Sequence, residues 1–151
     1  MDIECNEECN EYKLNSCLFF LTTKLAREFG KLADDAFSKT GLSPSHAILL
    51  YTINLKNGIQ QKELSETLHL TPSTITRLLD KLERKSYIEK QSEGKNVYIK
   101  TTTEGINQQE GIISSWNKLH NSYKDILTEE ETLKLLEISN KLIRNLGNNK
   151  I

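Results

Sequence analysis

Residues 71–86 predict a helix with one apolar side and one polar side, and this segment constrains the fold more than any other part of the chain. Thr71 followed by Pro72 is typical of a helix start, because a hydroxyl can accept an unpaired backbone N–H and proline sacrifices no hydrogen bond at the first helical position. Apolar residues then recur at helical spacing, at Ile75, Leu78, Leu79 and Leu82. This helix therefore buries one side and presents the other to solvent or to a partner.

The outward side of this helix carries side chains suited to DNA. Arginine can make a bidentate contact with guanine, and hydroxyl groups suit phosphates or several bases. The residues opposite the apolar stripe are Ser73, Arg77, Asp80 and Arg84, with Thr74, Thr76 and Lys81 on the flanks. Arg77 is our first candidate for base readout. The alternative is a solvated face with internal i,i+4 pairs such as Asp80 with Arg84.

The neighbouring segments favour the DNA interpretation. Residues 60–68 predict a short helix with Leu64 and Leu68 inward, and His69 and Leu70 form a tight turn before the next helix. Histidine adopts positive φ more readily than most residues. A helix pair joined by so short a turn can place its second helix in the DNA major groove.

A β-hairpin is predicted directly after the helix pair. Residues 88–91 and 96–101 form two extended runs, joined by the loop Ser92-Glu93-Gly94-Lys95. Lys95, at the tip, can reach a phosphate or the minor groove. The helix pair and this wing together predict a winged helix-turn-helix over residues 59–101.

The chain resembles the MarR family of bacterial transcription regulators. The matching stretches are residues 42–49, 61–83 and 97–105. The resemblance implies an obligate homodimer of triangular outline, whose N- and C-terminal helices interlock while two winged helices straddle a pseudo-palindromic operator. It also implies regulation by a small ligand or an oxidant.

One departure from the family pattern concerns the wing. Wings of the family commonly carry an Asp and Arg pair in a longer loop, whereas this wing is short and has no arginine. We therefore expect phosphate contact through Lys95 rather than an arginine inserted in the minor groove. The expected DNA-binding residues are Gln61, Lys62, Thr71, Ser73, Thr74, Thr76, Arg77, Lys81, Arg84, Lys95 and Asn96.

The flanking segments predict long amphipathic helices. An apolar stripe runs over residues 14–37, a helix capped by Thr102 is expected to reach Leu127, and Thr128 forms a capping box with Glu131 at the start of the last helix. The fold class expected is mainly α with a small hairpin wing between dimerisation helices. Residues 1–40 and 102–151 would form the dimer and residues 41–101 the DNA-binding domain. A monomer whose helices fold back on the winged helix is the alternative.

Composition is consistent with a cytoplasmic DNA-binding protein. The chain has 151 residues, of which 36% are hydrophobic, and no apolar run approaches the roughly 20 residues of a membrane span. The formal net charge is −1, but residues 1–12 carry five carboxylates and no lysine or arginine. Residues 61–101 carry eight basic and six acidic side chains, a local charge of +2. This small excess predicts weak non-specific binding with a clear salt dependence.

The cysteines and histidines predict no metal site or cofactor. Three cysteines without a secretion signal indicate free thiols, and the single histidines do not complete a zinc site with Cys5 and Cys9. Some MarR relatives sense hydroperoxides through a cysteine in the first long helix, so Cys17 is a candidate redox thiol; the alternative is a small core residue.

No enzyme is predicted, because the sequence has no phosphate-binding glycine loop or nucleophile elbow, and no pair of carboxylates stands out from ordinary surface charge. The expected mechanism is repression by occlusion of the operator. An effector bound between the dimerisation helices and the winged helix would change the separation of the two helices that begin at Pro72 and read the half-sites. His46, Tyr51 and Trp116 are candidate pocket residues. The remaining alternative is a winged helix that binds another protein, for which an apolar or aromatic face would be expected.

Overall fold

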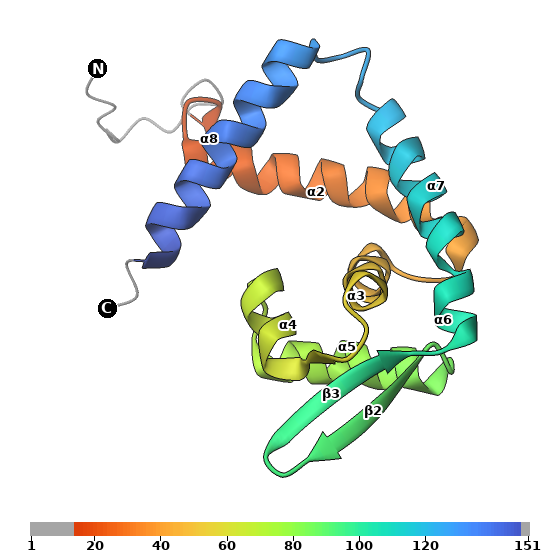
Figure 1. Cartoon of the computed structure of the whole chain (residues 1–151). Coiled ribbons are helices and arrows are strands. Elements are labelled where there is room, and N and C mark those ends of the chain that lie inside the picture. The colour runs from red at the N-terminus through yellow and green to blue at the C-terminus, as the bar shows by residue number, and fades with distance from the viewer. Residues whose placement is uncertain (1–13, 149–151) are drawn as a thin grey trace.

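The computed structural model describes residues 14–148, which form a mainly helical protein with one small antiparallel sheet (Figure 1). Its elements are α2 (Leu18–Phe37), the 3₁₀ turn η1 (Ser38–Thr40), α3 (Pro44–Leu55), β1 (Ile59–Gln60), α4 (Gln61–Leu68), α5 (Pro72–Arg84), β2 (Ile88–Glu93), β3 (Asn96–Thr101), α6 (Thr103–Asn107), α7 (Gln109–Asn121) and α8 (Glu129–Asn148). In Figure 1, α2, α7 and α8 form a frame above the winged helix. The predicted fold class, mainly α with a hairpin wing, is confirmed.

The sheet has the strand order β1-β3-β2, and both pairings are antiparallel. In the central strand, Ile99 pairs with Ile59 of β1 on one side and with Lys90 of β2 on the other. The sequence did not predict β1, because two residues are too few to show the alternation that marks a strand. This short strand anchors the wing beside the start of α4.

The wing is longer than predicted and its turn is shorter. Glu93 and Asn96 pair as the last residues of β2 and the first of β3, so a two-residue turn, Gly94-Lys95, replaces the expected four-residue loop. Gly94 has a φ of 60°, the left-handed conformation that two-residue hairpin turns require and that glycine adopts without strain.

One hydrophobic core lies between α3, α4, α5 and the sheet. The predicted apolar stripe of α5 is buried throughout, and Leu64 of α4 and Ile99 of β3 are fully buried beside it. Helix α3 contributes Leu49 and Ile53, whereas Ile48 is 37% exposed because it lies on the opposite side of the helix. Each fully buried Leu or Ile contributes about 1.5–3 kcal/mol, so this core holds the winged helix together as one body.

The first long helix begins later than predicted. Helix α2 starts at Leu18, and Cys17 is its N-cap with an extended backbone and no side-chain capping bond. Asn15 and Ser16, which favour turns over helix interiors, precede it in a turn closed by the Cys17 N–H bonded to the Leu14 carbonyl (3.0 Å). Cys17 therefore precedes the helix rather than lying within it.

The helix expected over residues 102–127 is broken at Gln108 and ends at Asn121. Thr102 caps α6 as predicted, its hydroxyl accepting the Gly105 N–H at 3.1 Å. The Gly105 carbonyl then accepts from the Asn54 side-chain amide (3.0 Å) and from the Gln108 N–H (3.2 Å). A carbonyl oxygen has two lone pairs, and Asn54 of α3 and Gln108 occupy both. The bond from the Gln109 N–H, which a continuous helix would require, is therefore not formed.

Gly105 also lies at a close backbone approach between the wing and α6. A Cβ atom at this position would lie 2.0 Å from the Tyr87 carbonyl oxygen. That same carbonyl accepts the Thr102 N–H at 3.1 Å, and the Thr102 hydroxyl donates to the Ser86 carbonyl at 2.6 Å. The end of α5, the end of β3 and the start of α6 therefore form a joint at which only glycine fits.

Candidate nucleic-acid interface

Helix α5 begins with the predicted cap. The Thr71 hydroxyl accepts the Thr74 N–H at 3.4 Å, and Pro72 occupies the first turn. The same Thr71 oxygen lies 3.2 Å from the Ser73 hydroxyl and 2.9 Å from the Thr74 hydroxyl. The hydroxyl groups of these three predicted DNA-binding residues therefore form one cluster that fixes the start of the helix.

The turn before α5 has the predicted geometry. His69 adopts a left-handed conformation with φ 51°, and its N–H donates to the Ser65 carbonyl. The Leu70 N–H donates to the same carbonyl at 3.2 Å, which closes the end of α4. This reversal at His69 and Leu70 directs the chain toward the first turn of α5.

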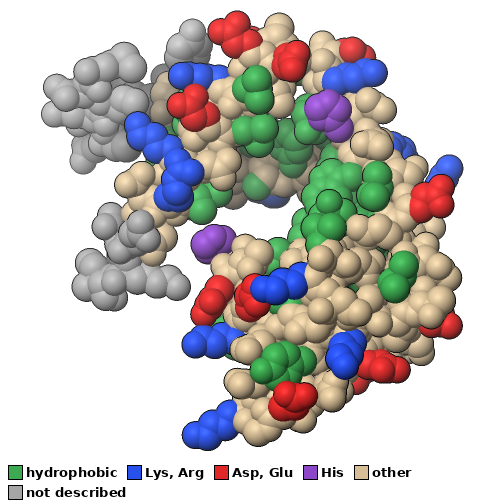
Figure 2. All heavy atoms as spheres, in the orientation of Figure 1, with side chains coloured by type: hydrophobic (Ala, Val, Ile, Leu, Met, Phe, Trp, Pro, Cys, Tyr) green, Lys and Arg blue, Asp and Glu red, His purple; other side chains and the backbone are tan. Residues whose placement is uncertain are grey.

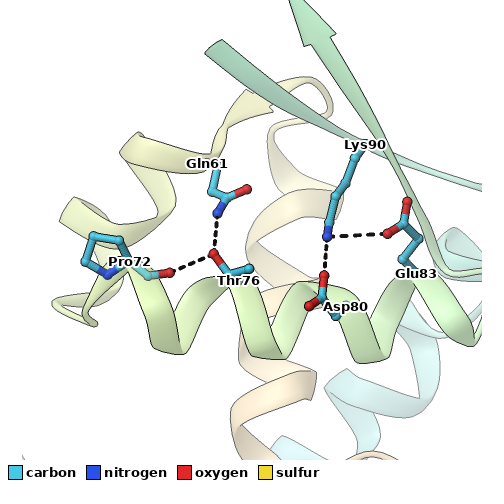
Figure 3. A network of polar contacts seen from close by, with 6 residues as sticks. All are labelled: Gln61, Pro72, Thr76, Asp80, Glu83 and Lys90. Atoms are coloured by element: carbon cyan, nitrogen blue, oxygen red, sulfur yellow. Dashed lines mark hydrogen bonds and ion pairs between the residues drawn. The ribbon is translucent and has the colours of Figure 1, made fainter. Parts of the chain in front are cut away.

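A second contact fastens α4 to α5. The Gln61 side-chain amide donates to the Thr76 hydroxyl at 2.8 Å, and this hydroxyl donates to the Pro72 carbonyl at 2.9 Å (Figure 3). Two predicted DNA-binding side chains, Gln61 and Thr76, thus have partners within the protein. Lys62, the next residue along α4, is exposed.

The exposed side of α5 carries a row of cations. Arg77, Lys81 and Arg84 are exposed and recur at i, i+4 and i+7, which places them along one side of the helix. Within residues 14–148, none of the three forms an ion pair. An uncompensated row of this kind can contact phosphates and base edges.

The acids of α5 are paired with the wing instead. Lys90 of β2 forms an ion pair with Asp80 and lies 3.3 Å from the Glu83 carboxylate, as Figure 3 shows. The alternative intrahelical pair of Asp80 with Arg84 is not formed. Sequence reasoning missed this role of Lys90, although a signal existed: Lys90 is two residues from the buried Ile88, so both face the core side of the strand.

The wing tip and the start of α4 come together beside α5. Lys95 and Asn96 are exposed at the turn, and with Gln61 and Lys62 they line part of a concave surface of about 470 Å³. This concavity brings four of the predicted DNA-binding residues, which are distant in sequence, to one side of the molecule.

The candidate effector residues are divided between two places. The rings of Tyr51 and Trp116 are in edge-to-face contact, with centroids 5.2 Å apart, and Trp116 also contacts Phe37 at 6.2 Å. His46 lies at the start of α3, where it is hydrogen-bonded to the Ser43 side chain. Burial and the nearby cations of α5 lower the pKa of His46. Tyr51 and Trp116 are thus brought together, while His46 faces α5.

Cys17 is half-buried and carries a free thiol, and Cys5 and Cys9 lie outside the described residues. In residues 14–148, no group of three or more His, Cys, Asp or Glu side chains is arranged to hold a metal ion. In the same part of the chain, no helix combines the length and hydropathy needed to cross a membrane.

Comparison with known proteins assigns this arrangement to a family. Residues 40–96 match the model of the MarR family. The HTH-type transcriptional regulator SarZ of Staphylococcus epidermidis is 32% identical over 132 residues, which cover 85% of this chain and 86% of SarZ. The chain belongs to the MarR family. The HTH-type transcriptional repressor MdtR of Bacillus subtilis is 26% identical over 111 residues, 72% of each chain.

A solved structure shows the same MarR fold. A MarR mutant from E. coli, complexed with operator DNA, superimposes with a TM-score of 0.79 at 22% identity and covers 89% of this chain and 99% of that one. This MarR-family chain is therefore a DNA-binding transcriptional regulator and not an enzyme.

Proposed function

We propose that this regulator is a repressor that binds a pseudo-palindromic operator as a homodimer and releases it on binding a small-molecule effector. The observation that carries the proposal is the exposed row of Arg77, Lys81 and Arg84, which forms no ion pair within the described residues. The name of the relative MdtR supports the assignment of repression.

Within this interface, Arg77 reads a base, because it lies in the N-terminal half of α5, the part of a recognition helix that contacts base edges. Lys81 and Arg84 contact phosphates farther along the helix. Lys62 and Lys95, which both line the concave surface, contact the flanking backbone, and Asn96 adds a neutral contact at the wing. The remaining predicted residues contribute indirectly, because their hydrogen bonds hold the first turn of α5 in the position from which it meets DNA. They are Gln61, Thr71, Ser73, Thr74 and Thr76.

The exposed apolar surface supports a homodimer. Twelve of the twenty exposed large hydrophobic residues among the described residues lie on α2 and α8. Phe19 of α2 is 79% exposed, and Leu133 and Leu146 of α8 are 61% and 70% exposed. Figure 2 shows hydrophobic side chains around the hollow between the frame and the winged helix. Monomeric proteins rarely leave so large an apolar area uncovered, and a second copy would bury it.

We propose the same division of the chain that the sequence predicts. Residues 1–40 and 102–151 form the dimer, and residues 41–101 form the DNA-binding domain, which acts on DNA in the cytoplasm. An effector bound near Tyr51 and Trp116, where α2, α3 and α7 meet, would alter the separation of the two reading helices. The effector must bind more tightly to the protein with one separation of these helices than with the other. A difference of about 1–3 kcal/mol in this binding free energy is enough to release the operator.

Selection from a random pool of duplexes tests DNA recognition. We expect the purified protein to enrich an inverted repeat whose half-site centres lie about one helical turn, roughly 34 Å, apart. Enrichment of a single, unrepeated site would contradict binding by a homodimer, and the absence of any enrichment would contradict sequence-specific recognition.

Sedimentation of two matched variants tests the dimer surface. Leu146→Glu places a charge on the apolar side of α8 and should convert the protein to monomers. Leu55→Glu is the control, because Leu55 is equally accessible at 68% but lies at the end of α3 in the winged helix. Equal behaviour of the two variants would contradict assembly through α8.

A further inference from the structure

Lys90 belongs to the wing, but its side chain is directed toward α5 and away from solvent. The side chain is 21% exposed, whereas the side chains of its partners Asp80 and Glu83 are 49% and 46% exposed. Burial lowers the pKa of Lys90, but the two carboxylates outweigh this effect and raise the pKa above its ordinary value. Lys90 is therefore a charged side chain held against α5.

The position of Lys90 changes the electrostatics of the reading helix. Helix α5 carries three cations and two carboxylates, a net charge of +1. Lys90 raises the charge of this surface to +2 and binds the two carboxylates on the wing side of the helix. Affinity for DNA depends on the number of cations that can reach phosphates. Lys90 can therefore raise the affinity without touching DNA, because it neutralises carboxylates that would otherwise compete with phosphates for the other cations.

Without Lys90, the carboxylate of Asp80 would have another cation within reach. Arg84 lies four residues later on the same helix, the spacing at which opposite charges pair. Such a pair would hold the Arg84 guanidinium along the helix surface and withdraw it from phosphates. Lys81, adjacent in sequence to Asp80, would also lie beside an uncompensated negative charge.

We propose that Lys90 is a positioning residue for DNA binding, which occupies the carboxylates of α5 and thereby keeps Arg84 and Lys81 available to the duplex. This inference rests on the proposed role of α5 as the reading helix. It assigns Lys90 a function different from that of Lys95: Lys95 contacts phosphate at the wing tip, whereas Lys90 acts through Asp80 and Glu83.

A charge-compensation experiment tests the inference. Lys90→Gln should weaken binding to the selected operator and to a random duplex by about tenfold, and should reduce the salt slope by about 0.9 per protomer, the value for one lost phosphate contact. Adding Asp80→Asn and Glu83→Gln to this variant should restore binding to within about twofold of the native protein. Lys31→Gln is the control: it also breaks an ion pair of lysine, with Glu28 at 2.8 Å, but on the exposed surface of α2.

Two outcomes would overturn the inference. Lys90→Gln could bind with native affinity and salt slope, or the triple variant could stay as weak as Lys90→Gln, which would show that Lys90 only fastens the wing. If Lys90→Gln does not fold by circular dichroism, Asp80→Asn with Glu83→Gln in the native background decides. Unweakened binding with an unchanged salt slope is expected, because Arg84 and Lys81 stay available, whereas weakened binding would show that the contact only fastens the wing. Failure of the native protein to prefer its selected operator would instead refute the proposed function of α5.

Discussion

Replacing Arg77 with alanine is the most direct test of base readout by α5. Arg77 is exposed and forms neither an ion pair nor a side-chain hydrogen bond within residues 14–148, so its removal leaves the core and the helix cap unchanged. Surface substitutions of this kind change the free energy of unfolding by at most about 0.5 kcal/mol. Any larger effect of Arg77→Ala must therefore arise in the DNA complex.

The expected loss of affinity follows from the contact and from symmetry. A bidentate arginine–guanine contact contributes about 1–3 kcal/mol of discrimination. A homodimer presents Arg77 twice, so the operator complex should lose about 2–6 kcal/mol, or roughly 30-fold to 10⁴-fold in Kd. A random duplex offers Arg77 only phosphate, and its complex should lose much less.

Fluorescence anisotropy of the selected operator and of a scrambled duplex, at one salt concentration, measures both losses. Arg27→Ala removes an exposed arginine from α2 and serves as the control for net charge. Equal losses on the two duplexes would show that Arg77 contacts only the backbone of DNA, and would refute its assignment to base readout.

Three further predictions concern the wing, the core and the last helix. Lys95→Ala should weaken binding to every duplex alike and lower the salt slope by about 0.9 per protomer, whereas a change confined to the operator would contradict its assignment to phosphate. Because burial lowers the folded-state pKa of His46, the unfolded chain binds more protons below about pH 6.5, and the free energy of unfolding should fall as the pH decreases through the folded pKa. Urea titrations should show this slope weakened in His46→Gln; an unchanged slope would assign it to other groups. Thr128→Ala removes a capping box in which the Thr128 hydroxyl accepts the Glu131 N–H at 3.1 Å and the Glu131 carboxylate accepts the Thr128 N–H at 2.8 Å, and should reduce stability by about 1 kcal/mol in thermal melts.

The sequence predicted those parts of the fold that depend on local periodicity and capping. The apolar residues of α5 recur every three or four positions, and all four are buried. Thr71, Thr102 and Thr128 cap the helices that they were expected to cap, because a hydroxyl before a helical segment acts within three residues. His69 adopts the predicted positive φ for the same local reason.

The features that the sequence did not predict depend on residues distant along the chain. The break at Gln108 follows from a contact of Asn54, 51 residues before Gly105. Lys90 reaches Asp80 only because β2 packs against α5, and no spacing rule for a single helix includes such a pair. The partners of Gln61 and Thr76 likewise became evident only when α4 and α5 were placed together.

The joint at Gly105 divides the molecule into parts that can evolve at different rates. On α5, the exposed cations have no packing role, so a substitution there leaves the fold intact and, under the proposed function, changes only the contact with DNA. At Gly105 even a methyl group would collide with the Tyr87 carbonyl, a backbone atom that no side-chain rearrangement can move. After gene duplication, single substitutions can therefore diversify the exposed cations of α5, whereas Gly105 can change only together with the backbone around Tyr87.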